Sequence, residues 1–360
     1  MTPKRETDGY FLLSARNVLN GAIDVSDVDY VGAAEYHRMK QRCGPDAGDV
    51  LISCSGTIGR VAVVPAGFEC VLVRSVALVK INRELADGVF LQFWLQGRKA
   101  QGQVASSVNQ GAQPNLFLNH IERLVCPHPP LSEQRAIAAA LSDVAALLDG
   151  LDRLIAKKRD LKQAAMQQLL TAQTRLPGFK GEWEVKRLGE VAHIKTGGRN
   201  NEDKVEGGSY PFFVRSETVE RINSYSHECE AILVPGEGRI GDIFHYIHGR
   251  FDVHQRVYAI SQFKPGVSGK FVYLYMAMNF GAWAMQNTVK ATVDSLRLPT
   301  FQTFELRVPP TVDEQTAITE VLSDMDAELS ALEARRDKTR ALKQGMMQEL
   351  LTGKTRLVNG

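Results

Sequence analysis

Apolar residues recur every three or four positions along two long stretches of the chain, a spacing that is typical of helices packed along a seam. The first stretch runs from about Leu131 to Ala172, and at about 1.5 Å per residue it predicts a rod of roughly 60 Å. Ordinary core helices carry similar stripes, but the length and the scarcity of Gly and Pro favour two long helices that pack on each other. The predicted seam positions are Leu141, Val144, Leu148, Leu151 and Ile155 in the first stretch and Leu322, Met325, Leu329 and Leu332 in the second.

The two helical stretches are copies of one sequence. The segment "LKQAAMQQLLTAQTRL" at 161–176 returns as "LKQGMMQELLTGKTRL" at 342–357, which is 181 residues later. Self-similarity at a fixed spacing is the mark of an internal repeat. A proline pair precedes each copy, at 129–130 and 309–310, where an extended segment must stop and a helix can begin.

The repeat continues more weakly into the segments before the helices. The turn-like "SGTIG" at 55–59 aligns with "EGRIG" at 237–241, and Arg74 aligns with Arg256. The chain therefore consists of two units, each a variable part followed by a well-matched helix.

The variable parts mix two hydrophobic patterns. Short β-branched runs bounded by Gly and Pro predict strands, whereas longer apolar runs predict short helices. The strand-like runs are "DVLISC", "VAVVPA", "VLVRSVALVKI", "AILVPG" and "RVYAISQF", and the helix-like runs are "GVFLQFWLQGR" and "KFVYLYMAMNFGAWAM". We predict an α+β fold for each variable part.

Composition narrows the class of protein. The chain of 360 residues, 44% of them hydrophobic, has room for two or three domains of roughly 100 to 200 residues. A net charge of +2 is milder than expected for a stand-alone nucleic-acid binder, so another subunit would help to hold DNA. Five cysteines without a C-x-x-C pair fit a reducing cytoplasm. The absence of a leader-like or membrane-length apolar run predicts neither secretion nor membrane insertion.

Two short motifs suggest nucleotide binding, and their contexts argue against it. "GEGRIG" at 236–241 has the dinucleotide-binding spacing, but a strand-like "DIFHYIHGRFDVH" follows where a helix would have to begin. We expect a strand-turn-strand there, with glycines at positive φ. "TGKT" at 352–355 lacks the first glycine of a phosphate-binding loop and ends a helical stretch. No methyltransferase or nuclease signature is present in the sequence, so we predict no catalytic residues.

A metal site is also disfavoured. The second variable part contains His227, Cys229, His245, His248 and His254, but without the paired spacing that zinc prefers, and the first part has no matching histidines. We predict no metal ligands in this set.

Polar loops rich in arginine and amides are the remaining candidates for function. Arg and Lys can pair with guanine, and Asn and Gln with adenine, in the major groove, while Lys and Ser suit phosphates. Solvated turns have a similar composition, so the pattern alone does not separate the two. The candidate DNA-binding residues are Arg16, Asn17, Arg74, Asn109, Gln110, Gln113, Lys195, Arg199, Asn200, Arg215, Arg239, Gln255, Arg256, Lys290 and Arg297.

The whole chain resembles the specificity subunits of type I restriction-modification systems. The resemblance rests on the helix start "PPLSEQRAIAAALSD", the helix end "LKQAAMQQLLTAQTRL" and the opening "WEVKRLGEV" at 183–191. It implies two target-recognition domains that each read one half of a bipartite DNA site. It also implies an antiparallel coiled coil with pseudo-two-fold symmetry, which spaces the domains and docks two modification subunits.

The resemblance also fixes the expected domains and partners. They are target-recognition domains at 1–127 and 178–307 and helical spacers at 128–177 and 308–360. The chain would be non-catalytic and cytoplasmic, with S-adenosylmethionine, ATP and Mg used by methyltransferase and motor-endonuclease subunits. A subunit of a combined methylase-nuclease system and a coiled-coil adaptor without a DNA role are the alternatives.

The first unit departs from the family pattern. Tyr10 aligns with Tyr210, so the element "GEWEVKRLGEVAHIKTGG" that precedes Tyr210 has no counterpart. Either the start codon is misassigned or the first recognition domain is incomplete. An incomplete domain would expose a strand edge and apolar surface.

Overall fold

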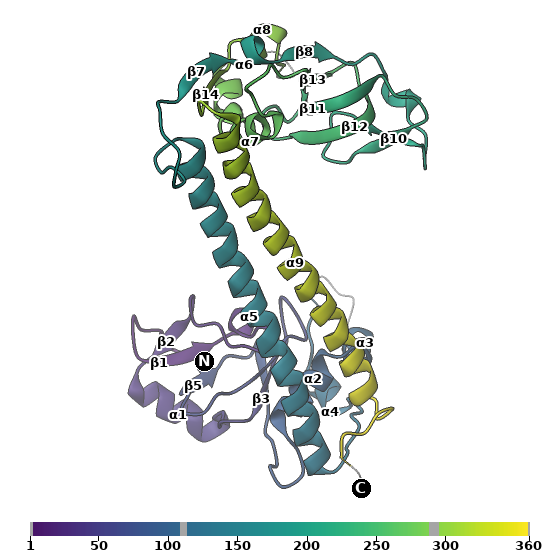
Figure 1. Ribbon diagram of the computed structural model, residues 1–360. Coiled ribbons are helices and arrows are strands. Elements are labelled where there is room, and N and C mark those ends of the chain that lie inside the picture. The colour runs from purple at the N-terminus through teal and green to yellow at the C-terminus, as the bar shows by residue number, and fades with distance from the viewer. Residues whose placement is uncertain (1–2, 109–113, 288–294, 359–360) are drawn as a thin grey trace. The chain divides into compact units, whose positions relative to one another are not determined.

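The computed structural model describes residues 3–108, 114–287 and 295–358 (Figure 1). The chain divides into two compact units, and each unit combines one α+β domain with parts of both long helices. Unit 1 contains Met1–Arg153 and Ala334–Gly360, and unit 2 contains Leu154–Glu333. The predicted α+β class is confirmed.

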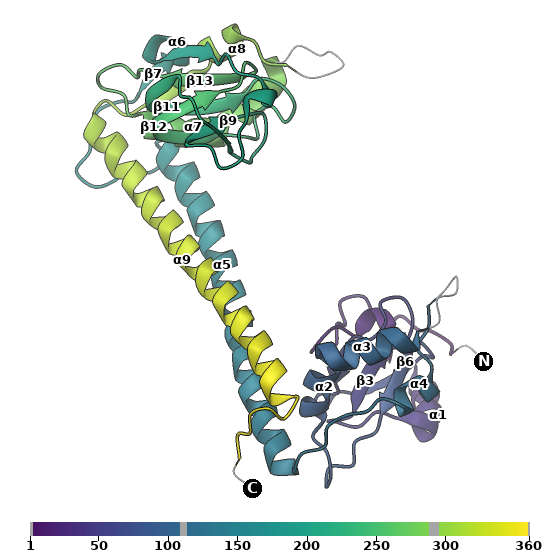
Figure 2. The same cartoon turned by 90° about the vertical axis from the view of Figure 1, so that its right-hand side faces the viewer.

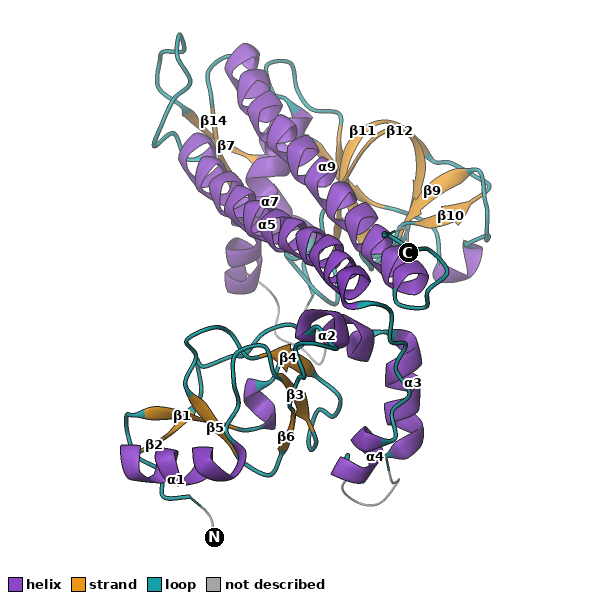
Figure 3. Ribbon diagram, turned by 90° about the horizontal axis from the view of Figure 1, so that it is seen from below, coloured by secondary structure: helices purple, strands orange, loops and turns teal. Residues whose placement is uncertain are grey.

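The domain of unit 1 contains two small sheets with strand orders β2-β1-β5 and β4-β3-β6 in its described part. Figure 3 shows α2 beside β4, and the apolar face of α2 buries Phe90, Phe93 and Trp94 against this sheet. The elements are β1 (Tyr10–Leu13), η1 (Ala15–Asn17), β2 (Asp29–Val31), α1 (Ala33–Cys43), β3 (Val50–Ser53), β4 (Val61–Val63), β5 (Cys70–Leu72), β6 (Val76–Val79), α2 (Gly88–Gln96), α3 (Arg98–Ser107) and α4 (Leu118–Glu122).

The domain of unit 2 is built on a longer sheet with strand order β10-β9-β12-β11-β13-β8 in its described part, beside a separate β14-β7 pair. Figure 2 shows β11 and β13 adjacent, and Ile232 of β11 lies opposite Ile260 of β13. The elements are β7 (Glu184–Arg187), α6 (Leu188–Val191), β8 (His193–Thr196), η2 (Asn201–Asp203), β9 (Tyr210–Phe213), β10 (Glu220–Ile222), β11 (His227–Pro235), β12 (His245–Val253), β13 (Val257–Ser261), α7 (Gly269–Asn287), α8 (Leu298–Gln302) and β14 (Glu305–Val308).

The predicted strands and short helices are present, with one difference. The run "VLVRSVALVKI" is not one strand, because β5 ends at Leu72 and β6 begins at Val76. The turn between them is closed by the N–H of Val76, which donates to the carbonyl oxygen of Val73. The two strands belong to different sheets, so a local apolar run could not show the break.

The glycine-rich turn confirms the expected strand-turn-strand. Gly238 and Gly241 have φ values of 88° and 76°, and Gly56 and Gly59 in the other unit have φ values of 68° and 80°. All four lie in the left-handed region that glycine adopts without a Cβ penalty. The glycines of the "GxGxxG" motif therefore form a tight turn before β12.

The long helices α5 (Leu131–Leu170) and α9 (Val312–Leu350) run antiparallel, as their ion pairs demonstrate. In unit 2, Lys158 pairs with Glu328 at 2.7 Å, and Lys162, one turn further along α5, pairs with Asp326, which precedes Glu328 on α9. Residue numbers therefore rise on one helix as they fall on the other. Of the predicted seam positions, Leu141, Leu151, Ile155, Leu322 and Leu329 are buried, and Val144, Leu148, Met325 and Leu332 are half-buried. Leu141 and Leu322 are buried in the cores of the two domains.

The C-terminus of α9 explains the "TGKT" motif. Gly353 has a φ of 74°, its N–H donates to the carbonyl of Leu350, and the N–H of Lys354 donates to the carbonyl of Glu349. This pair of bonds is a helix-terminating motif that favours glycine at the left-handed position. The corresponding residue after α5 is Ala172, with a φ of 60°, so the first copy holds a strained alanine where the second has glycine.

The glutamate of the repeated Glu-Gln pair binds the end of the other helix copy. In unit 2, Glu314 is 1% exposed and accepts from Arg175, with a distance of 2.8 Å from Nε to Oε1. In unit 1, Glu133 accepts from the backbone N–H groups of Leu357 at 2.8 Å and Val358 at 2.7 Å. The Leu357 hydrogen bond contributes most to a lowered pKa of Glu133. The start of each helix copy thus holds the "TRL" end of the other copy.

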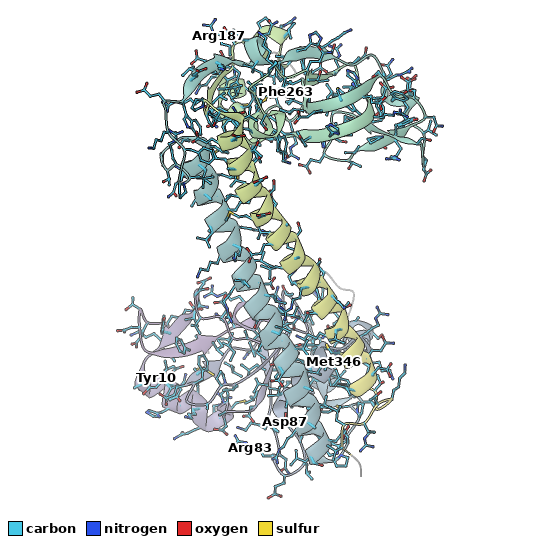
Figure 4. The ribbon with its side chains drawn as sticks, viewed as in Figure 1. Tyr10, Arg83, Asp87, Arg187, Phe263 and Met346 are labelled. Atoms are coloured by element: carbon cyan, nitrogen blue, oxygen red, sulfur yellow. The ribbon has the colours of Figure 1, made fainter. Side chains whose placement is uncertain are left out.

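The glutamine of the same pair fastens the α+β domain to its helix. Gln134 Nε2 donates to the carbonyls of Leu85 and Pro129, and its Oε1 accepts from the N–H of Asp87, which is labelled in Figure 4. Asp87 in turn accepts from the N–H of Phe90 and caps α2. A buried amide with three partners is well satisfied.

Gln315 repeats this arrangement in unit 2. Its Nε2 donates to the carbonyls of Gly266 at 3.0 Å and Pro309 at 3.1 Å, and its Oε1 accepts from the N–H of Ser268 at 2.7 Å. The Glu-Gln pair is therefore a structural element, because both side chains of both copies are at most 1% exposed.

Candidate nucleic-acid interface

Four turns of unit 2 meet at one end of its sheet and bring predicted residues together. The N–H of Arg199 donates to the carbonyl of Val253, and the N–H of Gln255 donates back to the carbonyl of Arg199 at 2.8 Å. The N–H of His254 donates to Phe213, and the N–H of Gly236 donates to Arg256. These backbone bonds position Arg199, Asn200, Arg215, Arg239, Gln255 and Arg256 as one cluster, which we call the arginine cluster.

Glu237 lies at the centre of the arginine cluster. Its carboxylate pairs with Arg256 at 3.1 Å and with Arg215 at 3.5 Å. Both arginine side chains remain more than half exposed, at 58% and 52%. Glu237 itself is only 23% exposed, so the arginine ends of these pairs are the groups that a phosphate or a guanine edge can reach.

The neighbouring Arg239 extends the cluster. It pairs with Glu217 at 2.8 Å and with Asp242 at 3.4 Å, and its side chain is 62% exposed. A surface hollow of about 370 Å³ lies beside these residues and is lined by Asn201, Val214, Arg215, Ser216, Glu220, Glu237, Gly238 and His254. Its lining contains two charge signs and several hydrogen-bonding groups, which suits base edges better than an apolar ligand.

Arg199 rests on a buried carboxylate. Asp252 is 1% exposed and accepts from Ser226 at 2.7 Å, from Ser224 at 2.9 Å and from Arg199 at 3.2 Å. Burial by itself would raise the pKa of Asp252, but the hydroxyl, backbone N–H and guanidinium donors outweigh it and hold the pKa below its usual range. The ionised carboxylate thereby orients the first residues of the Arg-Asn-Asn turn.

His254 is a neutral hydrogen-bond acceptor in the cluster. It is 6% exposed, and its Nδ1 accepts from the N–H of Arg256 at 3.0 Å, which assigns the ring proton to Nε2. Burial, followed by the charges of Arg215 and Arg256, lowers its pKa. The side chain therefore fixes the 254–256 turn in which Gln255 and Arg256 lie.

The other predicted residues of unit 2 lie at different places. Arg297 precedes α8 and is brought near the cluster, because the N–H of Leu296 donates to the carbonyl of Gly236. Lys195 lies within β8 opposite Ala259, outside the turns. Lys290 lies outside the described residues.

In unit 1 the two predicted residues Arg16 and Asn17 lie in different environments. Asn17 is 2% exposed, and its Nδ2 donates to the carbonyls of Asp24 and Asp27, so it holds a loop together. Arg16 pairs with Asp27 at 3.2 Å and with Asp29 at 3.3 Å. The Asn17 side chain is therefore buried away from any base, whereas Arg16, which is 46% exposed, stays a candidate. Asn109, Gln110 and Gln113 lie outside the described residues.

The structure corrects the alignment of Arg74 with Arg256. The N–H of Val76 donates to Val73 just as the N–H of Val257 donates to His254, which makes Arg74 the counterpart of Gln255. Outside the helices the two copies match weakly and their spacing varies, so the sequence alone could not show that the alignment shifts by one residue here. Arg74 is exposed and stays a candidate.

Sequence reasoning missed Glu237 and Asp252 as members of this interface. Glu237 replaces Ser55 within the otherwise matching "EGRIG" and "SGTIG" turns, and that substitution is the signal that could have marked it. Asp252 carried no signal, because a buried aspartate next to the end of β12 is recognisable only once its partners Ser224 and Ser226 are known. Of the five residues weighed as metal ligands, His227 stacks on Phe251 with ring centroids 5.0 Å apart. Within 3–108, 114–287 and 295–358, no His, Cys, Asp or Glu group is arranged to hold a metal.

Two duplicated α+β units, each tied to an antiparallel helix pair, and a solvent-facing arginine cluster on polar turns define a modular recognition protein. The chain belongs to the type I restriction modification DNA specificity domain family, whose model matches residues 22–157 and 180–340. None of the described helices is long and apolar enough to cross a membrane.

Several specificity subunits are similar to this chain. The type I restriction enzyme EcoDI specificity subunit of Escherichia coli is 28% identical over 48% of this chain and 37% of its own length. The putative type I restriction enzyme MjaX specificity subunit of Methanocaldococcus jannaschii is 23% identical over 99% of this chain and 90% of its own length. The crystal structure of the type I restriction-modification S subunit from M. genitalium has a TM-score of 0.65 at 15% identity, covering 98% of this chain and 91% of that one.

Proposed function

We propose that this chain is the DNA sequence-recognition subunit of a type I restriction-modification complex. The observation that carries the proposal is the duplication: two units with matching turns and the same Glu-Gln fastening, in a chain matched by the specificity-domain family over both units. A duplicated reader suits a target with two half-sites, because each module can contact a few base pairs independently.

The arginine cluster of unit 2 is the proposed reading surface for one half-site. Arg256 and Arg215 offer bidentate donors for guanine or phosphate, while Asn200 and Gln255 offer amides for adenine. The side-chain Nε2 of Gln255 donates to Oδ1 of Asn200, so these two amides are held side by side. Glu237 competes with DNA for the guanidinium groups of Arg215 and Arg256. It therefore favours DNA targets whose bases and phosphates offer an acceptor for each guanidinium N–H that leaves the carboxylate.

The partners follow from the same proposal. Two modification subunits would bind the helix pair and flip and methylate an adenine with S-adenosylmethionine, and restriction subunits would use ATP and Mg. The net charge of +2 fits such sharing, because partner subunits would supply many of the phosphate contacts that dominate affinity. The recognition chain itself contributes binding and positioning.

The test is a methylome. The chain is expressed with its modification partner in an unmethylated host, and modified bases are sequenced. A split motif with an unread gap supports the proposal, and Arg256→Ala should change one half of that motif only. Arg250→Ala is the matched control, because Arg250 is 49% exposed, pairs with Glu228 at 3.0 Å between β12 and β11, and lies outside both the arginine cluster and the helix pair. Methylation of a continuous motif would contradict the two-module reading.

A further inference from the structure

Two turns of the arginine cluster and the segment before α8 have counterparts in unit 1, where the same backbone bonds join them. The N–H of Cys54 donates to the carbonyl of Ser75, and the carbonyl of Cys54 accepts from the N–H of Leu116. In unit 2, Gly236 makes the equivalent two bonds with the 254–256 turn and with the residue before Arg297. Unit 1 therefore has a surface of the same backbone form, which we call the unit 1 turn surface and which consists of residues 55–59, 73–76 and 115–118.

The side chains on the unit 1 turn surface differ from those at the equivalent places in unit 2. The matching turns "SGTIG" and "EGRIG" differ at their first and third residues, and the residues before α4 and α8 differ as well. The exchanged pairs are Ser55 for Glu237, Thr57 for Arg239, Arg74 for Gln255, Ser75 for Arg256 and Phe117 for Arg297. Three arginines and a glutamate are thus replaced by neutral side chains, and one of these replacements is an aromatic ring.

The backbone of its turn holds Phe117 in an exposed position. The N–H of His120 donates to the carbonyl of Phe117 at 2.9 Å, as the N–H of Thr300 donates to the carbonyl of Arg297 at 2.9 Å. Phe117 is 53% exposed and is the only exposed phenylalanine in the part of the chain that the structure describes. Exposure is a property of this turn in both units, because Arg297 and the following Leu298 are exposed as well.

The ring of Phe117 also has a defined orientation. It packs edge to face against the ring of His120, with centroids 5.5 Å apart and planes at 73°. A ring that is already oriented loses little conformational entropy when it binds a ligand. Its neighbour Leu118 is 63% exposed. Two such side chains cover far less than the roughly 800 Å² that each partner buries in a stable protein interface, so a small apolar group is a ligand of better size.

We propose that Phe117 reads a thymine by contacting its 5-methyl group in the major groove of the half-site that unit 1 binds. The proposal rests on the proposed DNA-recognition function and adds the chemistry by which unit 1 discriminates between bases. The 5-methyl group of thymine is the apolar group among the base edges of the major groove, and phenylalanine is one of the side chains that suit it. Arg74 and Thr57 on the neighbouring turns suit the polar base edges beside it. Unit 1 thus combines an apolar contact with polar ones, whereas the arginine cluster of unit 2 offers guanidinium and amide groups.

The experiment measures the affinity of the complex between the full chain and its modification partner for duplexes that carry the split motif. The half-site of unit 1 is the half that Arg256→Ala leaves unchanged. Each thymine of that half, on either strand, is replaced in turn by deoxyuridine, which lacks only the 5-methyl group. One buried methyl group corresponds to about a fourfold change in affinity, so we expect one replacement to weaken binding about fourfold. In the Phe117→Ala complex the same replacement should have no further effect, because the contact has already been removed.

Leu85→Ala is the matched control, because Leu85 is 56% exposed and lies between β6 and α2, outside the unit 1 turn surface. Its complex should respond to deoxyuridine as the original complex does. The proposal is wrong if the half-site of unit 1 contains no thymine whose replacement weakens binding. It is also wrong if deoxyuridine weakens the Phe117→Ala complex as much as the original. Methylation of a continuous motif would contradict the proposed function together with this proposal, whereas a split motif without the deoxyuridine response contradicts only the role of Phe117.

Discussion

Replacing Gln315 by leucine removes three hydrogen bonds without changing the side-chain volume much. The substitution leaves the N–H of Ser268 and the carbonyls of Gly266 and Pro309 without this partner, whose own side chain is 0% exposed. A typical hydrogen bond contributes about 1 kcal/mol, so the loss of three predicts a local destabilisation of about 3 kcal/mol. That free energy corresponds to roughly a 100-fold rise in the open population, at about 1.4 kcal/mol per factor of ten.

The effect should be local, since the bonds join the loop before α7 to the start of α9. Hydrogen-deuterium exchange of residues 266–272 should accelerate about 100-fold, while exchange in unit 1 stays unchanged. Gln134→Leu should accelerate exchange at Leu85–Asp87 in unit 1 and leave exchange in unit 2 unchanged. Gln163→Leu is the control, because Gln163 is exposed on α5. An acceleration below threefold at residues 266–272 would refute the assignment of Gln315 as the fastening residue.

Three further outcomes can be measured. Arg256→Ala should weaken binding or relax specificity at one half-site by about 1–3 kcal/mol, checked by binding of the partner-bound complex to half-site variants; equal losses at both halves would contradict modular reading. Ala172→Gly should raise the free energy of unfolding in urea by about 1 kcal/mol, and Gly353→Ala should lower it by a similar amount, because both positions have positive φ. If the two substitutions do not change the free energy of unfolding in opposite directions, Ala172 is not strained. The pKa of His254 is lowered below 6.5, so its neutral form stabilises the fold above that pH and the contribution is lost as pH falls toward the folded-state pKa; an NMR titration midpoint at or above 6.5 would disprove this.

The interface could be predicted only in part. The arginines at 199, 215, 239 and 256 come from different turns, and the sequence marked each as a candidate without showing that they meet. Asn17 had the same polar surroundings as Asn200, yet it is buried and holds loop carbonyls. The difference arises from contacts between residues distant in sequence, which no local pattern records.

The sequence by itself determined the two long helices, their seam and the duplication. Helix periodicity and repeated spacing can be read along the chain without knowing which segments meet in space. It also determined the glycine turns, since positive φ depends on the residue's own side chain. Only the tertiary structure decided that Glu133 and Glu314 hold the far ends of the opposite helix copies and that Glu237 joins two arginines. These features depend on which segments meet in space, and burial and charge pairing across the chain are set by the fold as a whole.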